Sequence, residues 1–314
     1  MDFIKNFDIA QYKFILELKE LVSLPFYKGA TLRGGFGITF KKICCVVNLA
    51  SECNRCAYKS RCVYAYIFET APLPESNKLK KLKEIPRPFI IEPPLNNKSR
   101  YNNGEIFEFN LLLIGKAISY LPYFILTFKE LGDIGLGKKM AKFKLRKVCD
   151  FKGEVIFDSQ DNIIKMNTTK IDIFAFINKF ELKDEQITLD FLTPTRIKIK
   201  NDLIVKPEFF MVIKSLMHRL SALSYFHCNT ELAVDYNLLI SVAKNIKIKN
   251  ENLRWVEWER YSTRQDVRMK LGGFTGRVTY EGTFKLFLPF LILGQFTHIG
   301  KNCTFGLGKY VISI

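Results

Sequence analysis

Acidic residues are scarce in this sequence, and long uninterrupted apolar runs are absent. The chain has 31 Asp and Glu residues against 48 Lys and Arg residues, which gives a formal net charge of +17. No stretch approaches the roughly 18 uncharged apolar residues that a transmembrane helix needs, and the first residues lack the apolar core of a signal peptide. We therefore expect a cytoplasmic protein without a membrane partner. The charge predicts a polyanionic partner such as nucleic acid, with a solvated lysine-rich surface as the alternative.

Motifs for small nucleotides are missing as well. The terminal segment HIGKNCTFGLGKY (residues 298–310) is rich in glycine and lysine, but Phe305 stands where a mononucleotide P-loop needs its second glycine. No G-x-G-x-x-G motif follows a predicted strand. Given the charge, we interpret this segment as one whose backbone contacts the phosphates of a polynucleotide.

The pattern of apolar residues predicts two series of elements separated by a polar stretch at 151–185. In the first series we expect a glycine-rich helix start near residue 32, a helix at 117–131 and strands at 11–22, 89–91, 104–115 and 142–148. The second series has a strand at 186–200 and an amphipathic helix at 207–226, with Phe209, Ile213, Leu216, Leu220 and Leu223 on one stripe. Strands at 255–265 and 273–282, a helix, a glycine loop and a last strand complete it.

An internal repeat links the two series. Residues 121–148 and 288–313 each read as a Leu-Pro-led apolar helix, an Ile-Gly step, a glycine/lysine loop and a closing strand. Asp133 in the first copy falls opposite His298 in the second. Two βαββαβ units satisfy these elements, so the predicted fold class is α+β with tandem ferredoxin-like, RRM-like domains. We expect one domain at 1–165, with a cysteine-rich insert at about 44–70, and a second at 166–314 that carries the glycine-rich, RNA-contacting loop.

The insert holds the pattern Cys45-x7-Cys53-x2-Cys56-x5-Cys62, within a chain of eight cysteines. Without a secretory signal, clustered cysteines indicate metal ligands before disulfides. Four thiolates suit a closed, structural tetrahedral zinc site, which adds folding energy but leaves no open position for catalysis. A [4Fe–4S] cluster and a metal-free loop are the alternatives.

The three histidines stand in different settings. His218 lies off the apolar stripe of its helix, one turn from Lys214, and faces solvent or a partner. His227 at the helix end reads as a capping or packing residue. His298 starts the glycine loop, where it either reaches a ligand or caps the preceding helix. An imidazole in a phosphodiester-cleaving site suits acid or base catalysis because its ordinary pKa lies near neutrality.

Several of these segments together resemble one family. They are LRGGFG (32–37), the Cys-x2-Cys-x5-Cys insert followed by VYAYIFE, the W-x-x-W-x-R-Y-S-x-R-Q block from residue 255, and the terminal HIGKNCTFGLGKY. They resemble the CRISPR-associated repeat-processing endoribonucleases of the RAMP superfamily over nearly the whole chain. The resemblance implies metal-independent cleavage of the precursor CRISPR transcript within its repeats to give mature crRNA. In that chemistry the RNA 2′-hydroxyl attacks the adjacent phosphate and leaves a 2′,3′-cyclic phosphate.

Carried onto this chain, the resemblance implies His298 as general acid or base, with Lys301 and Arg264 stabilising the transition state. RNA contacts are expected from Arg33, His218, Arg260, Tyr261, Arg268, Lys270, Gly300, Gly306 and Gly308. Arginines offer planar forks to phosphate oxygens, and the tyrosine can stack on a base.

One departure from the family pattern leaves alternatives open. Many relatives carry a catalytic histidine on the first helix, and here that helix has none. Catalysis by His218, or by Lys and Tyr alone, therefore remains open, as does a non-catalytic crRNA-binding RAMP subunit of an effector complex. A tRNA- or rRNA-binding protein with a zinc knuckle is a third possibility. The expected partners are CRISPR repeat RNA, crRNA and other CRISPR effector proteins, with the chain as a monomer or homodimer.

Overall fold

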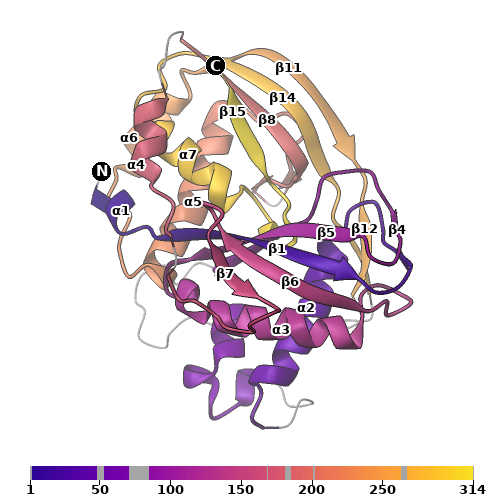
Figure 1. The fold of residues 1–314 in the computed structure, drawn as a ribbon. Coiled ribbons are helices and arrows are strands. Elements are labelled where there is room, and N and C mark those ends of the chain that lie inside the picture. Colours follow the sequence, from indigo (N-terminus) through magenta and orange to yellow (C-terminus); the bar gives the residue numbers. More distant parts are fainter. Residues whose placement is uncertain are drawn as a thin grey trace. The chain divides into compact units, whose positions relative to one another are not determined.

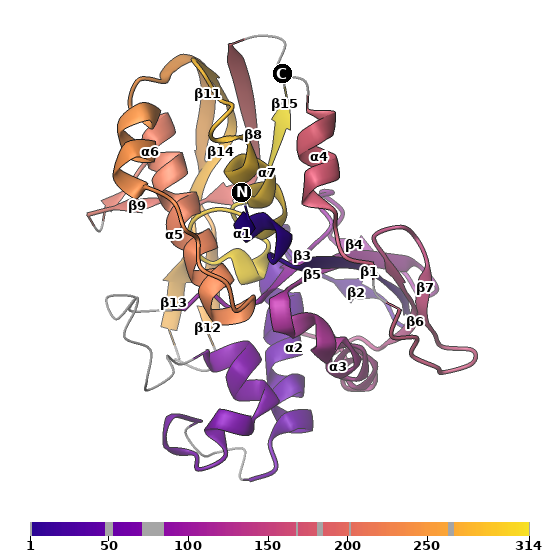
Figure 2. The same ribbon diagram turned by 90° about the vertical axis from the view of Figure 1, so that its left-hand side faces the viewer.

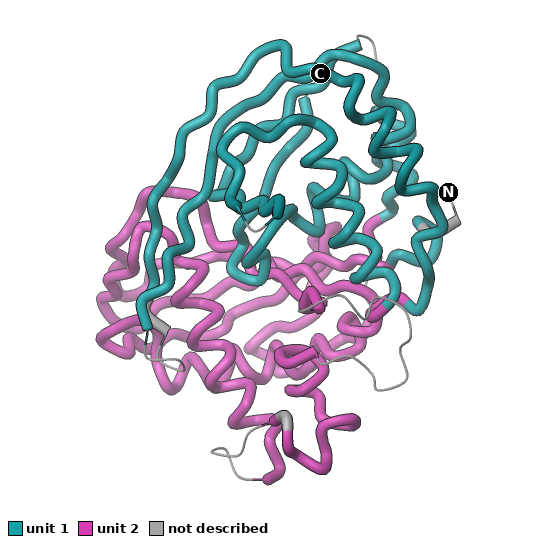
Figure 3. The backbone as a smooth tube through the Cα atoms, turned by 180° about the vertical axis from the view of Figure 1, so that it is seen from behind, with its two compact units in different colours: residues 1–7, 172–225, 229–314 teal, residues 8–171, 226–228 magenta. Residues whose placement is uncertain are grey.

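The computed structural model describes residues 2–47, 53–70, 85–167, 169–180, 185–200, 202–262 and 267–313. The chain forms two compact units (Figure 3). Unit 1 contains residues 1–7, 172–225 and 229–314, and unit 2 contains residues 8–171 and 226–228. Both units combine a sheet with helices, so the predicted mixed α/β class is confirmed.

Unit 2 is built on a five-stranded antiparallel sheet of order β3-β5-β1-β6-β7. Its strands are β1 (Ile9–Leu18), β3 (Phe89–Glu92), β5 (Ile106–Ile114), β6 (Phe143–Asp150) and β7 (Val155–Asp158). Helices α2 (Gly29–Cys44) and α3 (Leu121–Ile134) lie against one face of it (Figure 1). The short strands β2 (Val22–Ser23) and β4 (Arg100–Tyr101) pair separately, and the 3-10 turn η4 (Gly115–Tyr120) leads into α3.

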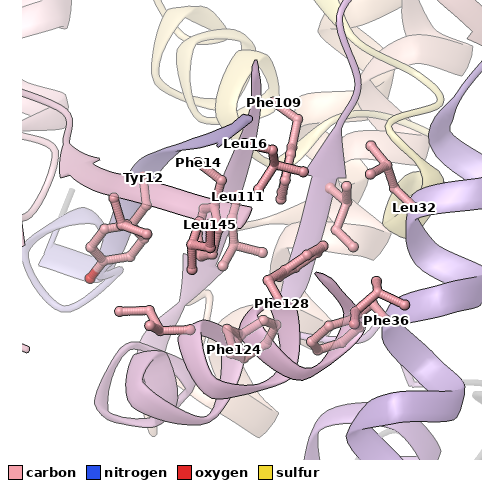
Figure 4. Packing of buried hydrophobic residues seen from close by; sticks show 14 of the residues in the cluster. Tyr12, Phe14, Leu16, Leu32, Phe36, Phe109, Leu111, Phe124, Phe128 and Leu145 are labelled. Carbon is pink, nitrogen blue, oxygen red and sulfur yellow. The ribbon is translucent and has the colours of Figure 1, made fainter. Parts of the chain in front are cut away.

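Aromatic rings fill the space between this sheet and its helices (Figure 4). The rings of Phe36 in α2 and Phe124 in α3 stack with centroids 4.8 Å apart, and Phe14 of β1 stacks on Phe109 of β5 at 5.0 Å. Because alternate residues of a strand point to one face, Tyr12, Phe14 and Leu16 all reach this core. Burial of such rings is the main stabilising contribution within unit 2.

The cysteine-rich segment follows α2 as three short turns, η1 (Cys53–Arg55), η2 (Lys59–Arg61) and η3 (Ala65–Glu69). In both ribbon views it projects beyond α2, away from the sheet of unit 2 (Figures 1 and 2). Cys53 of η1 packs against the core, and turn η3 contributes Ile67 and Phe68 to it. Gly37 permits this contact, because a Cβ there would lie 2.7 Å from the Phe68 ring.

Unit 1 has a four-stranded antiparallel sheet of order β11-β14-β8-β15. Its strands are β8 (Gln186–Thr195), β11 (Lys247–Val256), β14 (Gly273–Glu281) and β15 (Tyr310–Ser313). Helices α5 (Phe209–His227) and α7 (Leu288–Thr297) cover one face, with α4 (Ile173–Lys179) and α6 (Tyr236–Ala243) beside them (Figure 2). The small helix α1 (Asp2–Lys5) belongs to this unit, as do the hairpins β9 (Lys198–Ile199) with β10 (Asp202–Leu203) and β12 (Glu259–Ser262) with β13 (Val267–Lys270).

Two buried tyrosines connect the unit 1 sheet to its helices. The hydroxyl of Tyr310 donates a hydrogen bond to the Leu291 carbonyl of α7, and that of Tyr280 donates to the Pro207 carbonyl before α5, each at 2.6 Å. Burial raises the pKa of both phenols, so both stay protonated as donors. Gly294 allows the close approach, since a Cβ there would lie 2.1 Å from the Tyr310 oxygen.

The repeated pattern occupies equivalent places in the two units. Helices α3 and α7 both have proline in their first turn, where its missing N–H costs nothing, and each leads through a glycine loop into a closing strand. Strand β11 and helix α6 were not expected from the sequence. Most of β11 is exposed at the edge of its sheet, so it shows no apolar alternation. None of the helices within the described residues is long and apolar enough to span a membrane.

Candidate functional site

The glycine loop at residues 298–309 joins α7 to β15 in unit 1. Five of its residues have a left-handed backbone, namely His298, Gly300, Asn302, Gly306 and Gly308. The chain can then fold back on itself, with the Ile299 N–H donating to the Gly308 carbonyl at 2.9 Å. The Lys301 N–H donates to the carbonyl of Arg196, just beyond β8, also at 2.9 Å. The loop is therefore a fixed part of the sheet edge.

Two of the loop glycines are explained by contacts within the protein itself. A Cβ on Gly308 would lie 1.9 Å from the Ile299 carbonyl oxygen, and one on Gly300 would lie 2.4 Å from that of Arg196. No side chain fits at either place. Gly306 and Gly308 are buried, and Thr193 of β8 donates to the Gly306 carbonyl at 2.9 Å. The glycines that were predicted to contact RNA thus have a first role in closing the loop.

His298 is fully buried beneath this loop. Its Nδ1–H donates to the carbonyl of Leu307 at 3.0 Å, which connects the two ends of the loop. The sequence suggested an imidazole at the mouth of the loop, within reach of a ligand. In this structure it does not reach solvent, and Lys301, which was predicted to assist it, is exposed.

The other two histidines differ sharply in exposure. His227 is buried in unit 2, where its Nε2–H donates to the Pro86 carbonyl at 2.8 Å and its Nδ1 accepts from the Tyr66 hydroxyl at 3.1 Å. His218 is exposed on α5. Partial desolvation, and then the positive charge of Lys214, lower the pKa of His218 below its ordinary value of 6.5. A neutral imidazole at physiological pH can accept a proton.

Three arginines surround the glycine loop. Arg196 donates from Nη1 to the Gly272 carbonyl, while its own carbonyl holds the loop at Lys301. Arg219 of α5 donates from Nε to the Thr297 carbonyl at 2.8 Å, immediately before the loop. The Arg260 guanidinium of β12 lies over the Phe305 ring, 4.7 Å from its centroid. Segments distant in the sequence thus bring three cations to one edge of unit 1.

Each of these arginines has one guanidinium N–H group that makes no hydrogen bond to the described residues. Arg196 Nε, Arg219 Nη2 and Arg260 Nε are buried and have no hydrogen-bond partner among the described residues. No carboxylate in that part of the chain forms a direct ion pair with any of the three, although the charge of Glu257 acts on Arg196. Desolvation lowers the pKa of Arg196 and Arg260, yet a guanidinium stays charged at neutral pH. Such an arrangement favours an added anion, and phosphate matches the guanidinium fork.

Of these three arginines, only Arg260 was predicted from the sequence as an RNA contact. Arg260 stood out in its basic loop, whereas Arg196 and Arg219 are single cations in ordinary segments. The one available signal was that Arg219 adjoins His218; Arg196 falls inside the strand predicted at 186–200. Only the fold shows that Arg196 contacts the glycine loop and that Arg219 contacts Thr297 just before it.

The remaining predicted RNA-binding residues are dispersed. Arg268 and Lys270 are exposed on β13, and Tyr261 lies on the paired strand β12. Arg264 falls outside the described residues. Arg33 lies in unit 2, where its guanidinium packs 4.5 Å from the centroid of the Phe68 ring. Within unit 1, the structure brings Arg260 to the glycine loop.

The cysteines near α2 do not form a closed metal centre. No three His, Cys, Asp or Glu side chains of the described residues gather closely enough to hold an ion. Cys44, Cys53 and Cys62 instead pack against the hydrophobic core. Burial, followed by the negative charges of Cys62 and Cys45, raises the pKa of the Cys44 thiol to about 12. The residues between Cys45 and Cys53 fall partly outside the described part.

Comparison with known proteins places this site in a family. Residues 189–310, which contain the glycine loop and all three arginines, match the model of the CRISPR-associated endoribonuclease Cas6. This part of the chain is similar to the Cas6 endoribonucleases. Residues 7–169 match a second model, described as an N-terminal domain. No curated protein matches this chain by sequence.

Solved structures are similar to this chain in fold. The product complex of Cas6 (TTHB231) is 15% identical, with a TM-score of 0.59 over 97% of this chain and 100% of that one. Thermus thermophilus Cas6 (TTHB231) is 14% identical, with a TM-score of 0.55 over 98% of this chain and 99% of that one. A chain of a partial Cas6-RT-Cas1–Cas2 complex is 16% identical, with a TM-score of 0.59 over 98% of this chain. The present chain spans 46% of that larger protein, and 29% of the one in the complete complex.

Proposed function

We propose that this protein cleaves precursor CRISPR transcripts within their repeats and so produces mature crRNA. The observation that carries the proposal is the arginine-lined glycine loop inside the segment that matches the Cas6 endoribonuclease model. The guanidinium groups of Arg196, Arg219 and Arg260 contact RNA phosphates near the scissile bond. The exposed Arg268 and Lys270 contact the neighbouring backbone. A net charge of +17 attracts the transcript.

The proposed chemistry is an internal transesterification that needs no metal ion. The 2′-oxygen attacks the adjacent phosphorus and the bond to the 5′-oxygen breaks, which leaves a 2′,3′-cyclic phosphate and a 5′-hydroxyl. One proton leaves the 2′-hydroxyl and one is delivered to the 5′-oxygen. The arginines stabilise the charge that develops on the pentacoordinate phosphorus, which is the largest contribution that such a site can make.

We assign the acid–base role to His218, because it is the exposed histidine of the three. Its pKa below 6.5 keeps it neutral and able to accept the 2′-hydroxyl proton. His298, which the sequence suggested for this role, instead holds the glycine loop through Leu307. Lys301 and Arg264 remain candidates for electrostatic assistance.

Substitution of the two histidines tests this assignment. His218→Ala should slow cleavage about a hundredfold or more, with unchanged thermal stability, and the wild-type rate should fall only as the pH drops below 6.5. His298→Ala should lower the melting temperature, because His298 holds the glycine loop, and it should have little effect on the chemical step. Single-turnover cleavage across pH, with His218→Gln as the matched polar control, measures both. Full activity of a stably folded His218→Ala would reject the acid–base assignment and leave the arginine site untouched.

The proposal includes the finer fold assignment. The element order βαββαβ and the strand orders β3-β5-β1-β6 and β11-β14-β8-β15 support two ferredoxin-like domains. We place their boundary near residues 165/166, as expected from the sequence. The two compact units divide close to this position, at 171/172. The cysteine-rich segment is then an insert in the first domain.

A structural zinc ion in this insert remains a proposal that rests on cysteine chemistry and spacing. The described thiols are not gathered to hold it, so Cys45, Cys53, Cys56 and Cys62 would have to move together on binding. We expect about one zinc per chain by elemental analysis of anaerobically purified protein. A protein that folds and melts normally without metal would contradict the proposal.

RNA is the proposed main partner, and other CRISPR proteins are proposed as further partners. Similar structures are named as a Cas6 product complex and as Cas6-RT-Cas1–Cas2 complexes. A non-catalytic crRNA-binding subunit is the second candidate function, favoured by the absence of histidine from helix α2.

A further inference from the structure

A row of tyrosines lies on unit 2, remote in sequence from the glycine loop. It consists of Tyr66 in η3, Tyr120 at the end of η4 and Tyr123 in α3, and we call it the tyrosine ladder. The ring centroids of Tyr66 and Tyr120 are 5.6 Å apart, and those of Tyr120 and Tyr123 are 6.0 Å apart. The ladder therefore continues over three separate structural elements of one unit.

The inner end of the ladder is fixed. The Tyr66 hydroxyl donates to Nδ1 of His227, whose Nε2–H donates to the Pro86 carbonyl, so both ring nitrogens of this buried histidine are engaged. The His227 ring also packs edge-on against Tyr66, at a centroid distance of 5.6 Å. Burial, and then the charge of Cys228, raise the pKa of Tyr66, so its proton stays in this hydrogen bond. A rigid base limits the entropy lost when a ligand binds.

The outer end of the ladder is open. Tyr123 is 37% exposed, and its neighbour Leu126, one turn further along α3, is 45% exposed. Tyr120 is half-buried between the other two rings. The planes of neighbouring rings are inclined by 49° and 66°, so the rings do not form a parallel stack, and the exposed Tyr123 ring can accept a flat ring on its own face.

A cation accompanies the ladder. The Lys116 ammonium of η4 lies 5.5 Å from the Tyr66 ring centroid. Lys116 is exposed and forms no ion pair within the described part of the chain. Flat rings beside a lysine match the chemistry of single-stranded nucleic acid, whose bases stack while its phosphates meet the positive charge. A site for a protein partner would instead favour a larger apolar patch from which lysine is depleted.

We propose that the tyrosine ladder binds unpaired nucleotides of the RNA, with a base stacked on the exposed Tyr123 ring and a phosphate near Lys116. This proposal rests on the proposed function in that both concern RNA. It adds a second contact area, which would hold single-stranded RNA flanking the cleaved repeat. Because stacking accepts any base, the ladder contributes affinity without reading sequence.

Binding of a fluorescent oligoadenylate of about ten nucleotides tests the ladder directly. Tyr123→Ala should weaken binding about tenfold, and Lys116→Ala several-fold, whereas Tyr123→Phe should bind like wild type because it keeps the ring. Tyr58→Ala is the matched control, since Tyr58 is 60% exposed in the same unit but outside the ladder. Melting curves verify that each variant is folded.

The outcomes separate this proposal from the proposed function. Equal affinity of wild type and a folded Tyr123→Ala would overturn the ladder, and so would equal losses for Tyr123→Ala and Tyr58→Ala. A ladder that docks another protein would give the first of these results. Cleavage of a repeat RNA without flanking nucleotides should be unaffected by Tyr123→Ala. Failure of wild type to cleave that RNA would reject the proposed function, while the oligoadenylate titration would still decide the ladder.

Discussion

Alanine in place of Arg219 is expected to slow cleavage of CRISPR repeat RNA by about a hundredfold or more, the usual cost of removing one charged donor from a transition state. Arg219 Nη2 is buried without a hydrogen-bond partner in the described structure, while Nε is fixed on the Thr297 carbonyl. The guanidinium is thus oriented before RNA arrives. Single-turnover rates at saturating protein report the chemical step, and the separate binding constant should change much less.

Two further variants make this result specific. Arg219→Lys keeps the charge but loses the fork, so it should restore only part of the rate. Arg254→Ala removes an exposed arginine of β11 in the same unit and should leave the rate nearly unchanged. Because Arg219 also holds the end of α7, melting curves must show that the variant is folded. A folded Arg219→Ala that cleaves like wild type would remove this residue from the phosphate site.

Gly308→Ala is expected to destabilise unit 1 by about 4 kcal/mol, from backbone strain together with overpacking. The glycine has φ +74°, and the new Cβ would lie 1.9 Å from the Ile299 carbonyl oxygen. That carbonyl belongs to the loop backbone and is fixed by neighbouring hydrogen bonds, so it cannot move aside cheaply. Thermal or denaturant unfolding measures the loss.

Gly104→Ala provides the matched control for this effect. Gly104 also has a positive φ, +81°, but no atom lies within 4 Å of its Cβ position. Only the conformational cost of about 1 kcal/mol should remain. Equal losses at the two positions would mean that the close contact in the glycine loop contributes nothing, and that the loop is less rigid than its hydrogen bonds indicate.

Local patterns in the sequence predicted most of the fold. The repeated Leu-Pro-led helices occur as α3 and α7, because proline in a first helical turn and apolar periodicity are local signals. Strand β11 was missed because an exposed edge strand needs no apolar face. The predicted strand at 255–265 covers the end of β11 and all of β12, and residues 263–265 lie outside the described part.

The site was harder to predict than the fold, because burial and long-range proximity leave little trace in a local pattern. His298 looked like a ligand-facing residue by composition, yet its left-handed backbone and its bond to Leu307 place it under the loop. Arg196 and Arg219 become candidates only through contacts with residues far along the chain, Lys301 for Arg196 and, 78 positions away, Thr297 for Arg219. Two arginines that looked ordinary in sequence are therefore central to the proposed site.

The most direct test of the account is cleavage of CRISPR repeat RNA by the purified protein in EDTA, with mass spectrometry of the products. We predict one cut within the repeat, a 2′,3′-cyclic phosphate on the upstream fragment and a 5′-hydroxyl on the downstream fragment. A single 2′-deoxy nucleotide at the cut should abolish the reaction, because the attacking oxygen is then absent. Intact RNA after long incubation, or products with 5′-phosphate ends, would contradict the account.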